Sequence, residues 1–76
     1  QIIGCTEKSN NLIYKSNLKI PTAIILGSEE DGISNEYLKL CDLKVKIPLY
    51  GKIKSLNVSV SAGIMIYEAI RQKNEI

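Results

Sequence analysis

Hydrophobic positions change their spacing several times along the chain, and these changes predict alternating strands and helices. Residues 2–5 are a short, mostly apolar segment, and residues 22–26 (TAIIL) are an unbroken apolar run, typical of a parallel strand covered on both faces. Residues 43–47 (LKVKI) alternate apolar and charged positions, which predicts a third strand ended by Pro48. Residues 6–19 are polar and asparagine-rich, and we expect a loop around a short turn or strand.

Two segments have helical character. Ser34 is a good N-cap for a helix over residues 35–40, and Glu36 in its first turn suits the helix dipole. From about Asn57 to the C-terminus the chain is expected to be helical, with Glu68 away from a single apolar stripe made of Val58, Ala62, Met65, Ile66, Ala69 and Ile70. The order strand, helix, strand, helix predicts an α/β fold, a parallel sheet flanked by helices.

The start of this last helix has an unusual composition. Residues 55–62 (SLNVSVSA) alternate small polar and apolar positions, a period that by itself is typical of a half-buried strand. At a helix start, however, Ser55 and Asn57 can satisfy free backbone N–H groups, and Ser59 and Gly63 permit close packing. Capping needs one such side chain, so the others are candidates for holding a substrate. Capping and packing alone explain the pattern about as well.

Length and composition narrow the class of protein. The chain has 76 residues, lacks an initial Met and opens on a strand-like segment, so we expect one piece of a larger domain. Two cysteines, Cys5 and Cys41, could pair but are too few to staple a secreted scaffold, and no secretion signal is recognisable. We therefore expect a reduced, cytoplasmic protein. The absence of histidine excludes Ser-His and Cys-His nucleophilic schemes within this chain and argues against a zinc site, and no metal is expected.

The net charge of +2 is modest, but the placement of the basic residues is informative. No acid lies between Asp42 and Glu68, whereas four lysines do: Lys44, Lys46, Lys52 and Lys54. One explanation is a solvated strand edge followed by a solvated loop. The other is a surface for RNA phosphates, because clustered lysines supply the sequence-independent part of nucleic-acid affinity.

Two loops that follow predicted strands could form a ligand site, because open α/β sheets bind ligands outside the carboxyl ends of their strands. The first loop is residues 26–32 (LGSEEDG), and the second is residues 47–51 (IPLYG), which leads into Ser55. The first loop lacks the lysine and hydroxyl of a phosphate-binding loop and the alternating ligands of a calcium loop. Glu29 follows the glycine turn directly and would point into the cleft.

Several motifs together resemble the C-terminal half of the SpoU/TrmH family of RNA 2′-O-ribose methyltransferases. They are ILGSExxGI at residues 25–33, CD at residues 41–42, IPLxGxxxSLNVS at residues 47–59 and YEAxRQ at residues 67–72. The resemblance covers the chain from about Gly4 and is greatest to the branch that methylates a guanosine ribose in the large ribosomal RNA. It implies a deep trefoil knot, S-adenosylmethionine as cofactor and a homodimer with its sites near the interface.

The resemblance also assigns individual roles. The residues implied to hold the cofactor are Leu26, Gly27, Ile47, Leu49 and Leu56. The residues implied to line the place where the ribose hydroxyl meets the methyl group are Glu29, Ser55 and Asn57. The family's first motif, with an asparagine and an arginine, would lie before Gln1, and Ser61 stands where alanine is commoner.

We therefore predict the cofactor-binding portion of an enzyme that methylates a ribose 2′-hydroxyl of RNA, with ribosomal RNA favoured over transfer RNA. The alternative is a non-catalytic RNA- or nucleotide-binding module that uses the same cleft. The absent arginine motif favours the module for this piece alone, and the joined GSE and SLN segments favour the enzyme.

Overall fold

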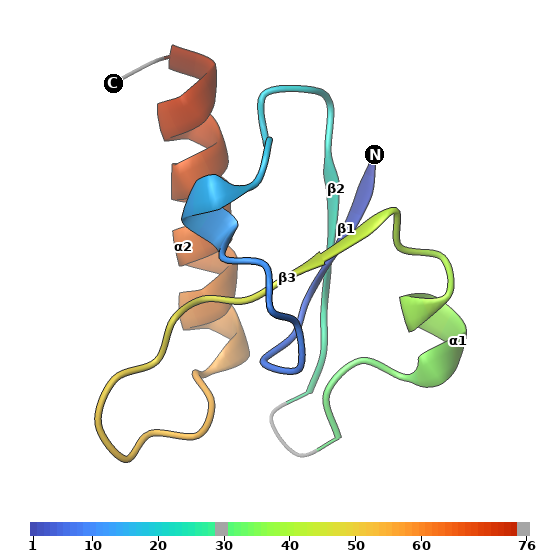
Figure 1. Ribbon diagram of the computed structural model, residues 1–76, viewed down its shortest axis with the longest axis vertical. Coiled ribbons are helices and arrows are strands. Elements are labelled where there is room, and N and C mark those ends of the chain that lie inside the picture. The colour runs from blue at the N-terminus through green and yellow to red at the C-terminus, as the bar shows by residue number, and fades with distance from the viewer. Residues whose placement is uncertain (29–30, 75–76) are drawn as a thin grey trace.

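A parallel sheet forms the centre of the computed structural model, which describes residues 1–28 and 31–74 (Figure 1). Within these residues β1 (Ile2–Cys5) lies between β2 (Ala23–Leu26) and β3 (Leu43–Val45), and both neighbours run parallel to it. The predicted strands and the α/β class are thus confirmed. β3 ends earlier than predicted, because Lys46 forms an isolated bridge with Leu12 instead of continuing the ladder with β1.

Helices lie to either side of this sheet. α1 (Asn35–Leu38) is on one side, and α2 (Val58–Asn74) is on the other with the short 3₁₀ helix η1 (Ile13–Lys15) beside it (Figure 1). α1 is a single turn, shorter than the predicted 35–40. Its first turn is closed by the carbonyl of Ser34, which accepts the N–H groups of Tyr37 and Leu38 at 3.1 and 2.9 Å, while the Ser34 side chain makes no capping hydrogen bond.

The core lies between the sheet and α2. Its fully buried side chains come from β1, β3, α2 and the segment around η1: Ile3, Ile13, Leu18, Val45 and Met65. The polar segment of residues 6–19, expected to be a loop, therefore contributes buried side chains through Ile13 and Leu18. No helix within the described part of the chain has the length and apolar character needed to cross a membrane.

The opposite face of the sheet is covered by the segment around α1. Side chains alternate along a strand, so Gly4 faces away from Ile3 and Cys5. A Cβ atom on Gly4 would lie 2.7 Å from Sγ of Cys41, so glycine makes room for that side chain. The two cysteines thus lie on opposite faces of the sheet, and both are free thiols.

The apolar stripe predicted for α2 is partly wrong. Met65 is fully buried and Ala69 packs against the core, but Ile66 and Ile70 are 50% and 43% exposed. The buried face contains instead Glu68, which was expected to lie away from it, and Gln72. Met65, Glu68 and Gln72 recur at three- and four-residue spacing, so they lie on one face of α2. This face, which includes two polar side chains, meets the core in place of the fully apolar face that the sequence predicted.

β2 is less covered than its apolar run predicts. Ala23 is exposed and the rest of the strand is half-buried. The reason is its position, because β2 pairs with β1 along one side and forms an edge of the described sheet.

Candidate functional site

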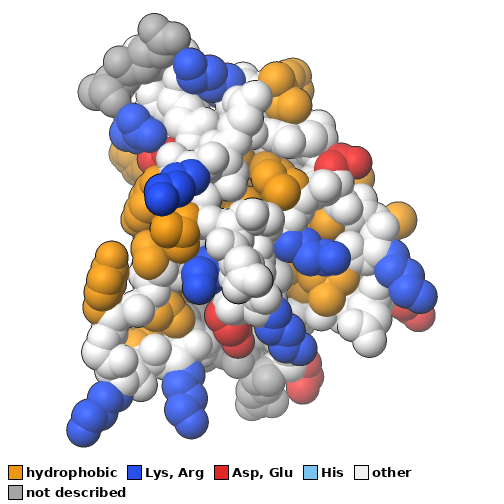
Figure 2. Space-filling model, viewed as in Figure 1, with side chains coloured by type: hydrophobic (Ala, Val, Ile, Leu, Met, Phe, Trp, Pro, Cys, Tyr) orange, Lys and Arg blue, Asp and Glu red, His pale blue; other side chains and the backbone are white. Residues whose placement is uncertain are grey.

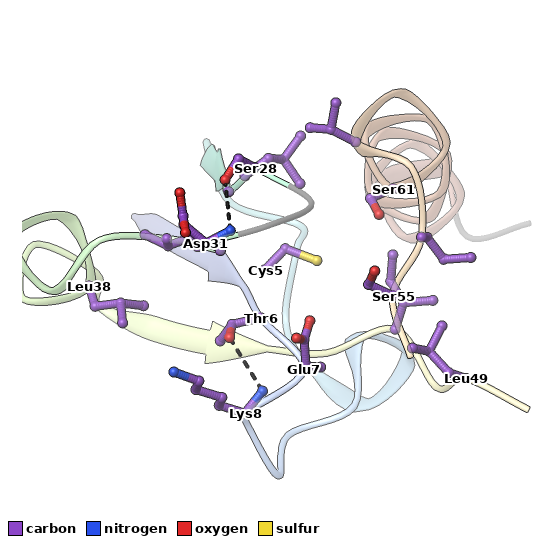
Figure 3. Close-up of a pocket in the computed structure, with 17 residues that line it drawn as sticks. Cys5, Thr6, Glu7, Lys8, Ser28, Asp31, Leu38, Leu49, Ser55 and Ser61 are labelled. Carbon is purple, nitrogen blue, oxygen red and sulfur yellow. Dashed lines mark hydrogen bonds between the residues drawn. The ribbon is translucent and has the colours of Figure 1, made fainter. Parts of the chain in front are cut away.

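A cavity of about 220 Å³ lies at the carboxyl ends of the parallel strands (Figure 3). Its walls come from the segments after β1, β2 and β3 and from the start of α2. This is the position at which open α/β sheets bind ligands, because loops from neighbouring strands diverge there. The cavity is smaller than the roughly 300–1,000 Å³ of most small-molecule sites, so a larger ligand would extend past its open side.

The structure brings the predicted cofactor residues together. Within the described residues the cavity is lined by the whole predicted set, Leu26, Gly27, Ile47, Leu49 and Leu56. These residues are separated by up to thirty positions along the chain, and they meet because β2 and β3 flank β1 in parallel. Most of them are apolar, which suits a site that removes a ligand from water and orients it with a few polar groups.

The three predicted catalytic residues have different outcomes. Ser55 lines the cavity, and Figure 3 shows its hydroxyl directed toward the interior. Asn57 does not line it, although its neighbours Leu56 and Val58 do. The side-chain Oδ1 of Asn57 accepts the N–H of Ser59 at 2.8 Å, which caps α2. Glu29 lies outside the described residues.

Gly27 is required by the loop itself. A Cβ atom at this position would collide with backbone atoms of Gly32 and Ile33. The loop folds back at this point through a bridge between Ser28 and Gly32, where the Gly32 N–H donates to the Ser28 carbonyl at 2.9 Å. Gly32 has a φ of 68°, in the region that favours glycine. Close approach of two backbone segments therefore shapes this wall of the cavity.

Sequence reasoning missed the contribution of β1. The segment that follows this strand supplies Thr6, Glu7 and Lys8, and the last strand residue supplies Cys5. Figure 3 shows the sulfur of Cys5 pointing into the cavity and the Glu7 carboxylate beside it. The strand-end rule applied to the other two loops would have found them, because residues 2–5 were also predicted to be a strand.

Other missed residues lie on the facing walls. Ser28 and Asp31 border the cavity on the β2 side, where the Asp31 N–H donates to Oγ of Ser28 at 3.0 Å, and Ser61 borders it from α2 (Figure 3). Hydroxyls and two carboxylates thus lie among the apolar residues that line the cavity. Such a mixture can hold a partly apolar ligand that carries positive charge.

The Cys5 thiol is held in its neutral form. Burial raises its pKa above the ordinary value, and the negative charge of Glu7 raises it further. A thiolate would be a strong nucleophile in this cavity, whereas a neutral thiol is a soft, polarisable wall. Because its pKa is raised, Cys5 is a weak nucleophile toward an electrophilic ligand in this cavity.

The four predicted phosphate-binding lysines do not line the cavity. Lys44, Lys52 and Lys54 are exposed, and Lys46 is half-buried. Figure 2 shows Lys and Arg side chains spread over the visible face and not gathered in one patch. Within the residues that the structure describes, no group of three or more His, Cys, Asp or Glu side chains could hold a metal ion.

The chain is similar to known proteins in both sequence and structure. The model of the SpoU rRNA Methylase family matches residues 1–67. A 23S rRNA (guanosine-2′-O-)-methyltransferase RlmB from Ralstonia nicotianae is 35% identical over 75 residues, which are 99% of this chain and 30% of that protein. A tRNA (guanosine(18)-2′-O)-methyltransferase from Aquifex aeolicus is 49% identical over 55 residues, 72% of this chain and 26% of that protein.

A solved structure agrees with these matches. The SpoU methyltransferase AviRb from Streptomyces viridochromogenes, in complex with the cofactor AdoMet, superposes with a TM-score of 0.89 at 34% identity. The superposition covers 96% of this chain and 28% of that one. The chain therefore spans about 30% of the length of the relatives that it matches.

Proposed function

Because the chain belongs to the SpoU rRNA methylase family, we propose that it is the cofactor-binding portion of an RNA 2′-O-ribose methyltransferase. In the proposed reaction a ribose 2′-oxygen bonds to the methyl carbon of S-adenosylmethionine while the carbon–sulfur bond breaks, and the hydroxyl proton passes to a base. The products are the methylated ribose and S-adenosylhomocysteine. The trefoil knot implied by the family resemblance and the cytoplasmic location expected from the cysteine content stay predictions.

One observation carries the proposal. Five residues assigned to the cofactor on the basis of sequence motifs come from three separate segments, and they line one cavity at the strand ends: Leu26, Gly27, Ile47, Leu49 and Leu56. The cavity also fits the chemistry of this ligand. Its apolar side chains suit the adenine and the methylene groups, and Glu7 and Asp31 provide negative charge for the sulfonium and amino groups.

The bound cofactor would supply the activated methyl group. This portion of the protein would mainly position the reactants and remove them from water. Leu49 and Leu56 line the cavity and would shield a bound ligand from water, and the Ser55 hydroxyl lies where it can orient a ribose. Because the Cys5 thiol is neutral, it would not compete with the RNA oxygen for the methyl group. Asn57, through its cap, fixes the start of α2 and thereby the positions of Ser55 and Leu56.

We propose ribosomal RNA as the substrate. The matching family model is that of the SpoU rRNA methylases, and the RlmB relative, which by its name acts on 23S rRNA, aligns with almost the entire chain. Methylation assays with a ribosomal RNA transcript and with a transfer RNA transcript distinguish the two substrates. Preferential methylation of transfer RNA would contradict this substrate assignment and leave the reaction class intact.

We also propose that the protein is a homodimer. The side of α2 turned away from the core exposes apolar side chains, among them Val60, Ile66 and Tyr67, at 50%, 50% and 74%. A second copy would cover such a surface. Ile66→Asp should convert a dimer to a monomer in light scattering, and a monomeric wild type would contradict the proposal.

The main test measures binding and catalysis in the full-length protein. S-adenosylhomocysteine should bind in calorimetry, and Ser61→Phe should abolish binding by filling the cavity. Lys73→Phe is the control, because Lys73 is exposed on the same helix, does not line the cavity and lies outside the proposed dimer surface. Equal binding by all three proteins would contradict the site. Binding without transfer of tritiated methyl groups to RNA would support the non-catalytic module.

A further inference from the structure

The loop of residues 50–54 (YGKIK) lies between two residues that line the cavity. Leu49 precedes it and Ser55 follows it, and both line the cavity, whereas the loop residues do not. All loop residues are exposed, and Figure 1 shows this connection between β3 and α2 projecting away from the sheet. The chain turns at Gly51, with a φ of 75°, and a Cβ atom there would meet nothing within 4 Å. The outer side of the loop is therefore open to a partner.

The loop presents an aromatic ring and two cations to solvent. The chain has four tyrosines and no other aromatic residue, and Tyr50 is the most exposed of them, at 82%. Lys52 and Lys54 are exposed, and within the described part of the chain neither ammonium group has an ion pair or a hydrogen bond. Ile53, between them, is 59% exposed. The positive charge of the loop is therefore not neutralised by a side chain that the structure describes.

An exposed ring beside cations is the combination with which proteins bind single-stranded nucleic acids, because the ring stacks on a base and the cations contact phosphates. The proposed reaction also brings a strand to this place. A ribose that reaches the cavity beside Ser55 carries its neighbouring nucleotides past the loop, since Lys54 is bonded to Ser55 and Tyr50 to Leu49. Consecutive Cα atoms are about 3.8 Å apart, close to the roughly 3.4 Å rise per nucleotide of a stacked strand. Side chains of the loop can thus reach the nucleotide next to the one in the cavity.

We infer that the 50–54 loop binds the RNA strand next to the methylated nucleotide, with the Tyr50 ring stacked on an adjacent base and with Lys52 and Lys54 on its phosphates. The inference rests on the proposed function and names residues that hold its substrate. Of the four lysines considered from the sequence, only these two belong to the loop, since Lys44 is in β3 and Lys46 follows that strand. The RNA contact is therefore local to the cavity and is not a basic patch of all four lysines.

The first test uses the full-length protein and a fluorescent single-stranded RNA of ten nucleotides. Replacing Lys52 and Lys54 by Ala should reduce the slope of log affinity against log salt by about 1.4, since each phosphate contact on a single strand contributes about 0.7. The control replaces Lys39 and Lys73 by Ala. It removes the same charge from exposed residues outside the loop, and it should leave most of the slope unchanged. Equal slopes for the two double variants would overturn the inference.

Tyr50 gives an independent measurement. Tyr50→Ala should weaken binding of this RNA about tenfold, whereas Tyr50→Phe keeps the ring and should bind as wild type does. Tyr37→Ala is the matched control, because Tyr37 is 57% exposed on α1 and lies outside the loop. It should also bind as wild type does. Unchanged binding by Tyr50→Ala, or an equal loss in Tyr37→Ala, would contradict the stacking contact and overturn the inference.

Two further measurements separate RNA from other occupants of the loop. S-adenosylhomocysteine should bind the loop variants as it binds wild type, because no loop residue lines the cavity. A monomeric Tyr50→Ala beside a dimeric wild type in light scattering would show that a second copy covers the ring, and would overturn the RNA contact. A wild type that binds S-adenosylhomocysteine and methylates RNA while the loop variants bind RNA normally would overturn the inference and keep the proposed function.

Discussion

At its N-terminal end α2 borders the cavity with Ser61 and the preceding Ser55, whereas its C-terminal half buries Glu68 and Gln72 in a closed network. The hydroxyls at the first end face a space that a ligand can enter (Figure 3). The polar groups at the second end are bound to one another and to the backbone of the segment after η1. The same helix therefore uses polar side chains for a ligand at one end and for chain docking at the other.

The difference has consequences for substitutions. Buried polar groups that already have partners contribute to folding, and losing one partner leaves the other unsatisfied. Polar groups around a cavity contact water in the free protein and a ligand in the complex. Their loss therefore affects binding or catalysis and has less effect on folding stability. Changes at the two ends of α2 should thus be separable, with activity lost at one end and stability at the other.

The largest expected effect is at Asn57, where capping and positioning can be separated. Asn57→Asp keeps a good N-cap and removes the amide, so the melting temperature should be close to that of wild type. If the amide positions the reacting ribose, methyl transfer should fall about a hundredfold, as expected for a misplacement of about 1 Å. Tritiated methyl incorporation into a ribosomal RNA transcript measures this.

Asn57→Ala is the companion variant. It removes the cap as well and should cost about 0.5–2 kcal/mol of stability. Full activity of the Asp variant would show that Asn57 acts only as a cap, and the catalytic role implied by the family resemblance would then be wrong.

At the other end of the helix, Gln72→Ala should mainly reduce stability. The Leu18 N–H, which is buried, would lose its acceptor, and an unsatisfied buried group costs about 1–3 kcal/mol. Urea unfolding measures the change, and the affinity for S-adenosylhomocysteine should not change. The neighbouring Lys73→Ala, at an exposed position, is the control. A loss of cofactor affinity in Gln72→Ala with normal stability would contradict the separation of the two ends.

The sequence predicted the ligand end of α2 better than the docking end. Strand-end loops and the start of a helix are local features, and they pointed to Ser55, Leu56 and the loop at Gly27, which the structure places around one cavity. The β1 contribution, with Cys5 and Glu7, was missed because only two of the three strand ends were considered.

The docking end depends on contacts between distant residues. A buried Glu68 and Gln72 are acceptable only because Arg71 and the backbone of residues 16–18 satisfy them, and nothing in the helical spacing shows these partners. Ile66 and Ile70 are apolar and were therefore expected to be buried, yet they are exposed. The hydrophobic pattern alone does not distinguish a face that meets the core from one that another surface would cover.

The smallest expected effect is a dependence of stability on pH at Glu68. Its hydrogen bond with Arg71, followed by that with Gln72 and the Arg71 charge, lowers the pKa of Glu68 although burial opposes this, and the same hydrogen bond raises the pKa of Arg71. An unfolded Glu titrates near pH 4.3, at about its ordinary value. In acid the unfolded chain therefore binds the proton more readily than the folded one, and stability falls as the pH drops.

The contribution of Glu68 should be fully present above about pH 4.3 and disappear as the pH falls through its lower folded pKa. Urea unfolding between about pH 3 and 7 should show a smaller acid loss for Glu68→Gln than for wild type. Glu36→Gln, which removes an exposed acid on α1, should follow the wild-type curve more closely. The difference should be modest, because the Arg71 side chain is 50% exposed and solvent screens the pair. Identical acid dependence of wild type and Glu68→Gln would show that the hydrogen bonds of this network, and not its charge, hold the segment after η1 on the helix.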